Sequence, residues 1–205
     1  VTFTTLGFVM STIFECVILH LWSSKSNYIV PFYPNFFGDF KWTTYSLFHV
    51  LIVAYWRDAH FYFVHRLMHK WNFKICGVDF GYVLYKNVHS LHHKSKNPGP
   101  WSGLSMHPVE HALYYTCTLT CLVFPLHPYH FLYTKFHADI SPIAGHDGYD
   151  KPAGGSAFHY LHHSLVDCNY GTPLVPLDYL FGTLRSDEAK AAQIRSNRGK
   201  EQKLN

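Results

Sequence analysis

Residues 58–69 read DAHFYFVHRLMH, and the spacing of their polar side chains predicts a helix with one polar face. His65 and His69 are four residues apart, and Asp58 and Tyr62 stand seven and three residues before His65. Residues at these separations share one stripe of an α-helix. The stretch therefore predicts two imidazoles that point at one metal ion, with a carboxylate behind them.

Two further strings contain closely spaced histidines, HSLHH at residues 89–93 and HYLHH at residues 159–163. On a helix, positions i, i+3 and i+4 lie on one face, so each string is expected to present three imidazoles in one direction. With 17 histidines in 205 residues, a given HxxHH string arises by chance only about 0.1 times in this length. Two such strings are therefore not explained by composition. Other histidines are interpreted as structural; these are His20, His49, His60, His127, His130 and His137.

The composition narrows the class of protein. A chain of 205 residues suits a single domain. Only 15% of the residues are charged and 48% are hydrophobic, with a formal net charge of +4, which excludes a disordered protein or one that coats nucleic acid. The five cysteines include no CxxC pair and the chain has only four glutamates. A thiolate zinc site or a carboxylate-rich di-iron bundle is therefore not indicated, and a metal site must consist mostly of nitrogen ligands.

Apolar runs predict a membrane protein. The run from Val1 to Trp22 has the length that crosses a bilayer, although Glu15 interrupts it. A second run from Trp42 to Val64 is expected to complete a hairpin, and we predict an embedded hairpin over residues 112–136. Because the chain opens inside an apolar run without Met, we expect it to be a piece of a longer one.

The expected architecture is all-α, with integral-membrane helical hairpins and a cytosolic helical cap that holds a histidine-rich site for two metals. A catalytic domain would cover residues 1–185, with the membrane hairpin at 1–64, the cap at 65–111 and 137–185, and a polar tail at 186–205. Basic residues gather after the second run, so the positive-inside rule places the cap in the cytosol; these residues are Arg57, Arg66, Lys70, Lys74, Lys86, Lys94 and Lys96.

Eight histidines in three strings exceed the ligands that one zinc ion takes, so we expect two metals. Neutral nitrogen ligands suit iron, zinc or copper. Without bridging thiolates or an HExxH helix, hydrolytic zinc lacks its usual general base. Redox iron at a membrane surface is the sharper hypothesis.

The three strings, in this order and with an embedded hairpin between the second and third, resemble the sterol desaturase and fatty acid hydroxylase superfamily of membrane non-haem di-iron enzymes. The resemblance runs from Asp58 to Thr183. It includes NPGPWSGLSMHPVEH at 97–111, AGHDGYD at 144–150 and NYGTPLVPLDYLFGT at 169–183.

The resemblance implies a set of metal ligands: His65, His69, His89, His92, His93, His146, His159, His162 and His163. His107 is a weaker candidate and His111 weaker still. Some members carry a further HxxxH before the last string, but Pro142 stands four residues before His146, so that pair is incomplete here. We interpret Asp58, Asp147 and Asp178 as acceptors that orient ligand imidazoles.

The resemblance also implies a reaction. Two iron ions would activate O2 and oxidise a C–H bond of a lipid, by hydroxylation or desaturation, with electrons from NAD(P)H through cytochrome b5 or a similar donor. A sterol or related lipid leads as substrate, while fatty acyl, alkylglycerol and carotenoid substrates stay open. The expected location is the endoplasmic reticulum with a cytosolic active site, or the plasma membrane of a bacterium. The rival interpretation is a non-catalytic membrane metal carrier or sensor.

Overall fold

The computed structural model describes residues 2–24, 39–71, 73–148 and 155–185. These residues form helices, with two isolated β-bridges and no sheet, so the all-α prediction is confirmed. The predicted tail at 186–205 lies outside the described residues. The elements in chain order are α1 (Thr2–Ser23), α2 (Phe40–Leu67), α3 (Phe80–Asn87), η1 (His89–Lys94), η2 (Pro100–Ser102), α4 (Pro108–Tyr115), η3 (Thr116–Leu122), α5 (Pro128–Gly145), α6 (Gly155–Leu165) and α7 (Leu177–Leu180).

Helix α1 is the apolar element of the fold. Within the described parts of the chain it is the helix whose length and mean hydropathy, 22 residues and 1.7, suffice to cross a membrane. Its acidic residue Glu15 pairs with Lys135 of α5 at 3.2 Å, and Lys135 also pairs with Asp139 at 2.8 Å. The carboxylate that interrupts the apolar run is therefore compensated by a neighbouring helix.

Helix α2 joins the second apolar run and the first histidine string in one element of 28 residues. Asp39 caps its start by accepting from the backbone N–H of Lys41 at 2.8 Å, which satisfies a free donor of the first turn. Although α2 is long, it falls short of the apolarity that α1 reaches, since Lys41, Arg57 and Asp58 lie in it. The pairing of α1 and α2 as a membrane hairpin stays a prediction.

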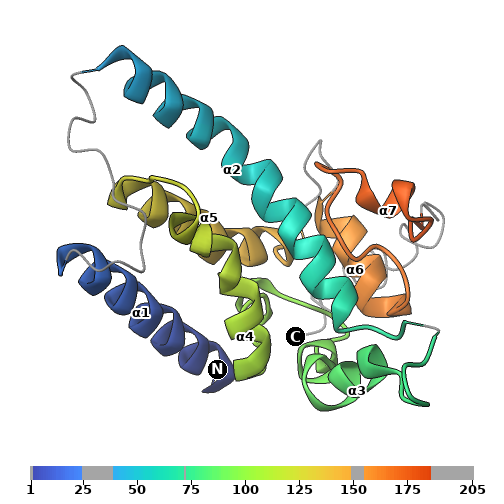
Figure 1. Ribbon diagram of the computed structural model, residues 1–205. Coiled ribbons are helices and arrows are strands. Elements are labelled where there is room, and N and C mark those ends of the chain that lie inside the picture. The colour runs from blue at the N-terminus through green and yellow to red at the C-terminus, as the bar shows by residue number, and fades with distance from the viewer. Residues whose placement is uncertain (1, 25–38, 72, 149–154, 186–205) are drawn as a thin grey trace.

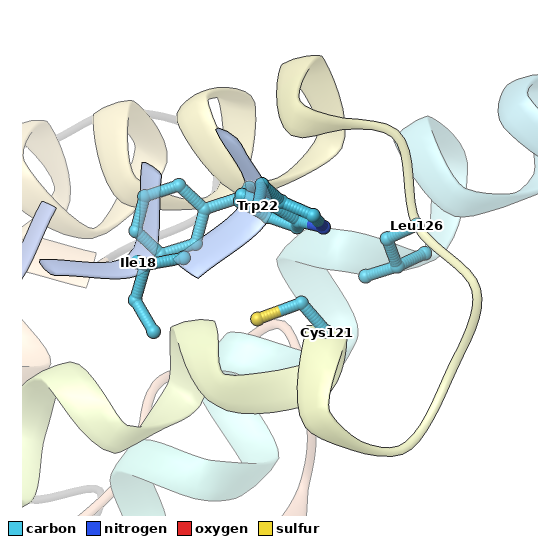
Figure 2. Packing of buried hydrophobic residues seen from close by; sticks show 5 residues of the cluster. Ile18, Trp22, Cys121 and Leu126 are labelled. Atoms are coloured by element: carbon cyan, nitrogen blue, oxygen red, sulfur yellow. The ribbon is translucent and has the colours of Figure 1, made fainter. Parts of the chain in front are cut away.

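The third apolar run folds as α4 and η3, and α5 returns after a turn at residues 123–127. The hydroxyl of Tyr114 donates to the carbonyl of Ala138 at 2.7 Å and ties α4 to α5. An apolar cluster packs α1 against this pair; Figure 2 shows Ile18, Trp22, Cys121 and Leu126, and Phe131 completes it. Burial of these side chains fixes α1 beside the returning helices.

The remaining elements gather at one end of α2. In Figure 1, α3, α6 and α7 lie around the C-terminal end of α2, while α5 runs beside α2 and ends near α6. The end of α2 carries His65, η1 follows α3 directly, and α6 contains the third string. The fold therefore brings three strings that are far apart in the sequence to the same place.

Candidate metal centre

The first histidine string lies where α2 ends. His65 is in the last turn of the helix and His69 follows its C-cap residue Met68. Both imidazoles are fully buried, and their Nε2 atoms are 3.3 Å apart. The spacing of four residues therefore brings the two rings together, as the sequence predicts.

The second string does not behave as an α-helix. It folds as the 3-10 helix η1, in which three residues complete a turn. His89 and His93 turn toward the first string, whereas His92 turns toward a different set of histidines. The expectation that all three imidazoles point in one direction is wrong for this string.

The third string is α-helical, and its three imidazoles also belong to two different groups. His162 joins the side of His65, while His159 and His163 join His92. His146, which ends α5 as its C-cap residue, completes this second set. One string therefore serves two sites.

All nine predicted ligands are buried and lie in two groups. Within each group, one possible ligand atom of every residue lies within 4.8 Å of the others. The five-histidine group consists of His65, His69, His89, His93 and His162, and the four-histidine group consists of His92, His146, His159 and His163. The groups adjoin, with the rings of His93 and His163 4.8 Å apart.

Hydrogen bonds fix the tautomers of several rings. The Nδ1 atoms of His65, His162 and His146 each lie 2.6 Å from a backbone carbonyl, those of Tyr170, Cys168 and Pro142 respectively. A carbonyl only accepts, so each Nδ1 carries the proton and Nε2 keeps its lone pair. Nδ1 of His89 lies 2.7 Å from a carboxyl oxygen of Glu110, and an ionised Glu110 only accepts, with the same result.

The Nε2 lone pairs of His65 and His89 face each other, and the Nε2 lone pair of His146 faces Nε2 of His163. The Nε2 atoms of His65 and His89 are 2.9 Å apart, and those of His146 and His163 are 3.1 Å apart. His65 and His89 both donate from Nδ1, so neither has a proton to place between their Nε2 atoms. Burial lowers the pKa of His89 to about 3 and, with the charge of neighbouring histidines, that of His163 to about 2. At neutral pH these rings therefore do not take up an additional proton that could form a hydrogen bond between the facing Nε2 atoms.

A metal cation between the Nε2 atoms would remove the repulsion between their lone pairs. Neighbouring ligands that each lie about 2.1 Å from one ion are about 3 Å apart when they subtend a right angle, using common metal–nitrogen distances. Nitrogen-only donors suit iron, copper or zinc rather than magnesium or calcium. The chemistry and the spacing of both groups therefore fit a metal ion.

A strained loop presents two of the acceptor carbonyls. Val166 and Asn169 have φ angles of 68° and 53°, a left-handed conformation that is costly for a β-branched residue. The side chain of Asn169 holds the loop, accepting from the N–H of Arg185 at 2.7 Å and donating to the carbonyl of Phe158 at 3.2 Å. The loop at residues 166–170 therefore aims the carbonyls of Tyr170 and Cys168 at His65 and His162.

Two predicted carboxylate roles are wrong. Asp58 bonds the guanidinium of Arg57 and the hydroxyl of Thr172 instead of an imidazole. Asp178 accepts from the N–H groups of Tyr170 and Gly171 at 2.8 and 2.7 Å, so it positions a carbonyl and not a ring. The seven-residue spacing in α2 placed Asp58 on the correct stripe, but two helical turns separate it from His65. Asp147 is half-buried beside His146, and its role stays a prediction.

The structure places the two weaker ligand candidates outside both groups. His107 is the N-cap of α4, where its Nδ1 accepts from the N–H of Val109 at 3.2 Å. His111 is buried one turn later and packs on Gly7 of α1, where a Cβ would come within 2.1 Å of the ring. Both histidines therefore serve the packing and capping of α4.

Glu110 is the functional candidate that the sequence analysis did not single out. It is buried and receives the Nδ1 proton of His89. Its place at the third position of a helix is typical of an ordinary capping residue. The useful signal was its rarity, as one of four glutamates, within a string that resembles the superfamily.

A cavity of about 240 Å³ adjoins both groups. Rings of both groups form part of its wall, and Phe61, Met106 and Leu174 supply apolar surface. The polar side chains of Arg57, Asp58 and Thr172 also line it. A small, mostly apolar space beside two metal-binding groups suits one end of a hydrophobic molecule.

The all-α fold gathers nine buried histidines into two groups that could each hold a metal ion, the arrangement expected of a histidine-box protein. A family model described as fatty acid hydroxylase matches residues 50–183, and the chain belongs to this family. The family resemblance identified in the sequence is thereby confirmed. No solved structure matches the chain.

Several curated proteins are similar. A Delta(7)-sterol 5(6)-desaturase of Gibberella zeae is 28% identical over 163 residues, which cover 72% of this chain and 45% of that protein. The lathosterol oxidase of Rattus norvegicus is 29% identical, over 66% of this chain and 44% of that protein. A very-long-chain aldehyde decarbonylase of Oryza sativa subsp. indica is 30% identical, over 74% and 57%. The chain thus spans about half the length of these relatives.

Proposed function

We propose that this chain is the catalytic region of an O2-dependent lipid oxidoreductase with two non-haem iron ions. The observation that carries the proposal is the pair of buried histidine groups, with facing lone pairs, on the wall of one apolar cavity. Family membership supports an oxidative role. When bound, the iron pair would supply the activation of O2 and the oxidation of a C–H bond.

The chain's own residues have three tasks in this proposal. The carbonyls of Tyr170, Cys168 and Pro142 and the carboxylate of Glu110 hold the imidazoles in one tautomer with Nε2 toward the metal. Such partners fix ring orientation and raise ligand basicity. Phe61, Met106 and Leu174 exclude water and align the hydrocarbon. Burial raises the pKa of the Glu110 carboxyl group, and bound cations would favour its ionised form, which would add negative charge beside them.

A sterol or related lipid is the substrate that we propose first, because two of the similar proteins are named as acting on sterols. Fatty acyl, alkylglycerol and carotenoid substrates are the alternatives. We further propose that electrons come from NAD(P)H through a cytochrome b5-type donor. Lysines exposed around the first two strings support an acidic donor; they are Lys70, Lys74, Lys86, Lys94 and Lys96.

The location follows from the same proposal. Helix α1 would anchor the chain in the endoplasmic reticulum membrane, or in the plasma membrane of a bacterium, with the histidine groups facing the cytosol. The apolarity of α1 and the exposed lysines near the histidine groups support this arrangement.

The test combines metal analysis with product analysis on detergent-solubilised protein. We expect two iron ions per chain, and an oxygenated or desaturated product from lathosterol when reductant and O2 are supplied. The His162→Ala variant should lose turnover, since His162 lies in the five-histidine group. His20→Gln is the matched control, because His20 belongs to neither group. Two metals without any product from a sterol or acyl lipid mixture would favour the carrier or sensor.

A further inference from the structure

The cavity beside the histidine groups has a buried arginine in its wall. Arg57 of α2 is 8% exposed and lines the cavity with Phe61 and Met106. Its Nε–H is buried and finds no hydrogen-bond partner among the described residues. A buried donor without a partner costs free energy, so this N–H is suited to a ligand that brings an acceptor.

The charge of Arg57 is already balanced. Its guanidinium pairs with the carboxylate of Asp58, whose second oxygen accepts from the hydroxyl of Thr172. A ligand carboxylate would therefore bring a second negative charge into a buried site, which is costly without a further cation. A neutral oxygen, as in a hydroxyl or a carbonyl group, can accept from Nε–H without this penalty.

The position of Arg57 relates this donor to the histidines. Arg57, Phe61 and His65 stand four residues apart on α2 and all line the cavity. Eight residues of helix separate Arg57 from His65, about 12 Å along the axis. The ring of Phe61 lies between them and stacks on His65 with centroids 4.9 Å apart. A molecule that binds Arg57 would thus extend along Phe61 toward the histidine groups.

The size of the cavity limits what enters. Its 240 Å³ is below the roughly 300–1,000 Å³ of pockets that enclose a drug-sized ligand. A lipid would insert one end while the rest lies outside. The only oxygen of a simple sterol or long-chain aldehyde is at one end, so that end is the one Arg57 can bind.

We propose that Arg57 is the specificity-determining residue of the cavity, binding a neutral hydroxyl or carbonyl oxygen at the inserted end of the lipid. This inference rests on the proposed function, because the lipid is that function's substrate. It adds that the oxidised carbon lies farther along the lipid from the bound oxygen, toward the histidine groups, and that free fatty acids are poor ligands. Asp58 and Thr172 act as positioning residues that hold the guanidinium.

The test measures equilibrium binding to iron-loaded protein kept anaerobic and without reductant, so that no turnover occurs. Radiolabelled lathosterol is displaced by unlabelled lathosterol, by its 3-deoxy analogue, by a long-chain aldehyde or by the corresponding fatty acid. We expect the 3-deoxy analogue to bind at least about tenfold more weakly than lathosterol, as for loss of a hydrogen bond to a charged group. Aldehyde displacement stronger than sterol displacement would assign the oxygen to a carbonyl.

Variants separate recognition from architecture. Arg57→Met with Asp58→Asn removes both charges together, and the preference for lathosterol over the deoxy analogue should fall to about onefold. Arg57→Lys keeps the ion pair but lacks the guanidinium fork, and its preference should also fall. Lys41→Met, which removes an exposed cation at the other end of α2 and outside the cavity, should keep the wild-type ratio. Melting temperature and iron content report folding in each case.

The outcomes are distinct. Equal binding of lathosterol and the deoxy analogue by the wild type would overturn the inference, as would an unchanged ratio in a folded Arg57 variant. A discriminating wild type that makes no product would instead overturn the proposed function and leave the recognition role intact. Product formation without discrimination would do the reverse.

Discussion

The five-histidine group draws on all three strings, whereas the four-histidine group draws on the second and third strings and on His146, and the two groups are held to different degrees. In the five-histidine group, the Nδ1 atoms of His65, His162 and His89 bond the loop carbonyls of Tyr170 and Cys168 and the carboxyl group of Glu110 on α4. In the four-histidine group, His146 donates to Pro142, whereas Nδ1 of His92 has no partner among the described residues. The first group is therefore more completely preorganised before a metal binds.

This difference predicts unequal affinities. Orientation by outer hydrogen bonds typically changes metal affinity by about 10- to 100-fold per partner. The five-histidine group has both more imidazoles and more fixed rings. We therefore expect it to bind its metal more tightly than the four-histidine group binds its own.

The largest effect should come from removing one ligand in each group. His163→Ala should lower the iron content from two ions per chain to one, because the four-histidine group falls to three ligands while the other group stays whole. In the wild type, a chelator should remove the metal of the four-histidine group first. Inductively coupled plasma mass spectrometry after graded chelation measures both effects.

The matched variant is His162→Ala, which lies next to His163 but belongs to the five-histidine group. It should also leave one ion per chain, but one that the chelator removes more easily. Loss of both ions in both variants would show that the groups act as one unit. The two groups would then not be independent sites with different affinities.

The sequence predicted the membership of the site better than its internal order. The histidine strings identified eight of the nine rings because such strings are rare by chance, and the family resemblance supplied His146. The division into two groups was not predictable, because the residue pattern shows neither that η1 is a 3-10 helix nor that the α-helical third string serves both groups. No residue in HSLHH distinguishes that helix from an α-helix by propensity alone.

The partners of the rings were the least predictable part. Carboxylates attract attention in a sequence, yet Asp58 and Asp178 do not contact an imidazole through their oxygens in the structure. The acceptors are mostly backbone carbonyls, as at Tyr170 and Cys168. Every residue has a carbonyl, so its use depends on loop conformation and leaves no pattern in the side chains.

A smaller effect on the iron affinity of the five-histidine group is expected at Glu110. Glu110→Ala removes the acceptor of His89 Nδ1, so iron affinity of the five-histidine group should fall by about 10- to 100-fold. The four-histidine group should keep its affinity, and the gap between the groups should narrow. Competitive titration with a chelator of known affinity measures this change.

Two variants test whether the effect belongs to the hydrogen bond. Glu110→Gln keeps an oxygen acceptor and should lose less affinity than the alanine variant. Glu15→Gln changes a glutamate of α1 that pairs with Lys135 of α5, so it should leave both affinities unchanged. An alanine variant with wild-type affinity would remove Glu110 from the support of the site.

The smallest effect is expected at His107, a histidine that resembles a ligand in the sequence but caps α4 in the structure. His107→Ala should lower stability by about 1 kcal/mol, as for loss of an N-cap, and lower the melting temperature by a few degrees. Iron content should stay at the wild-type value, because the ring lies outside both groups. His107→Asn supplies another good cap and should restore the melting temperature without supplying an imidazole. Loss of iron in both variants would instead make His107 a ligand and add a tenth ring to the comparison.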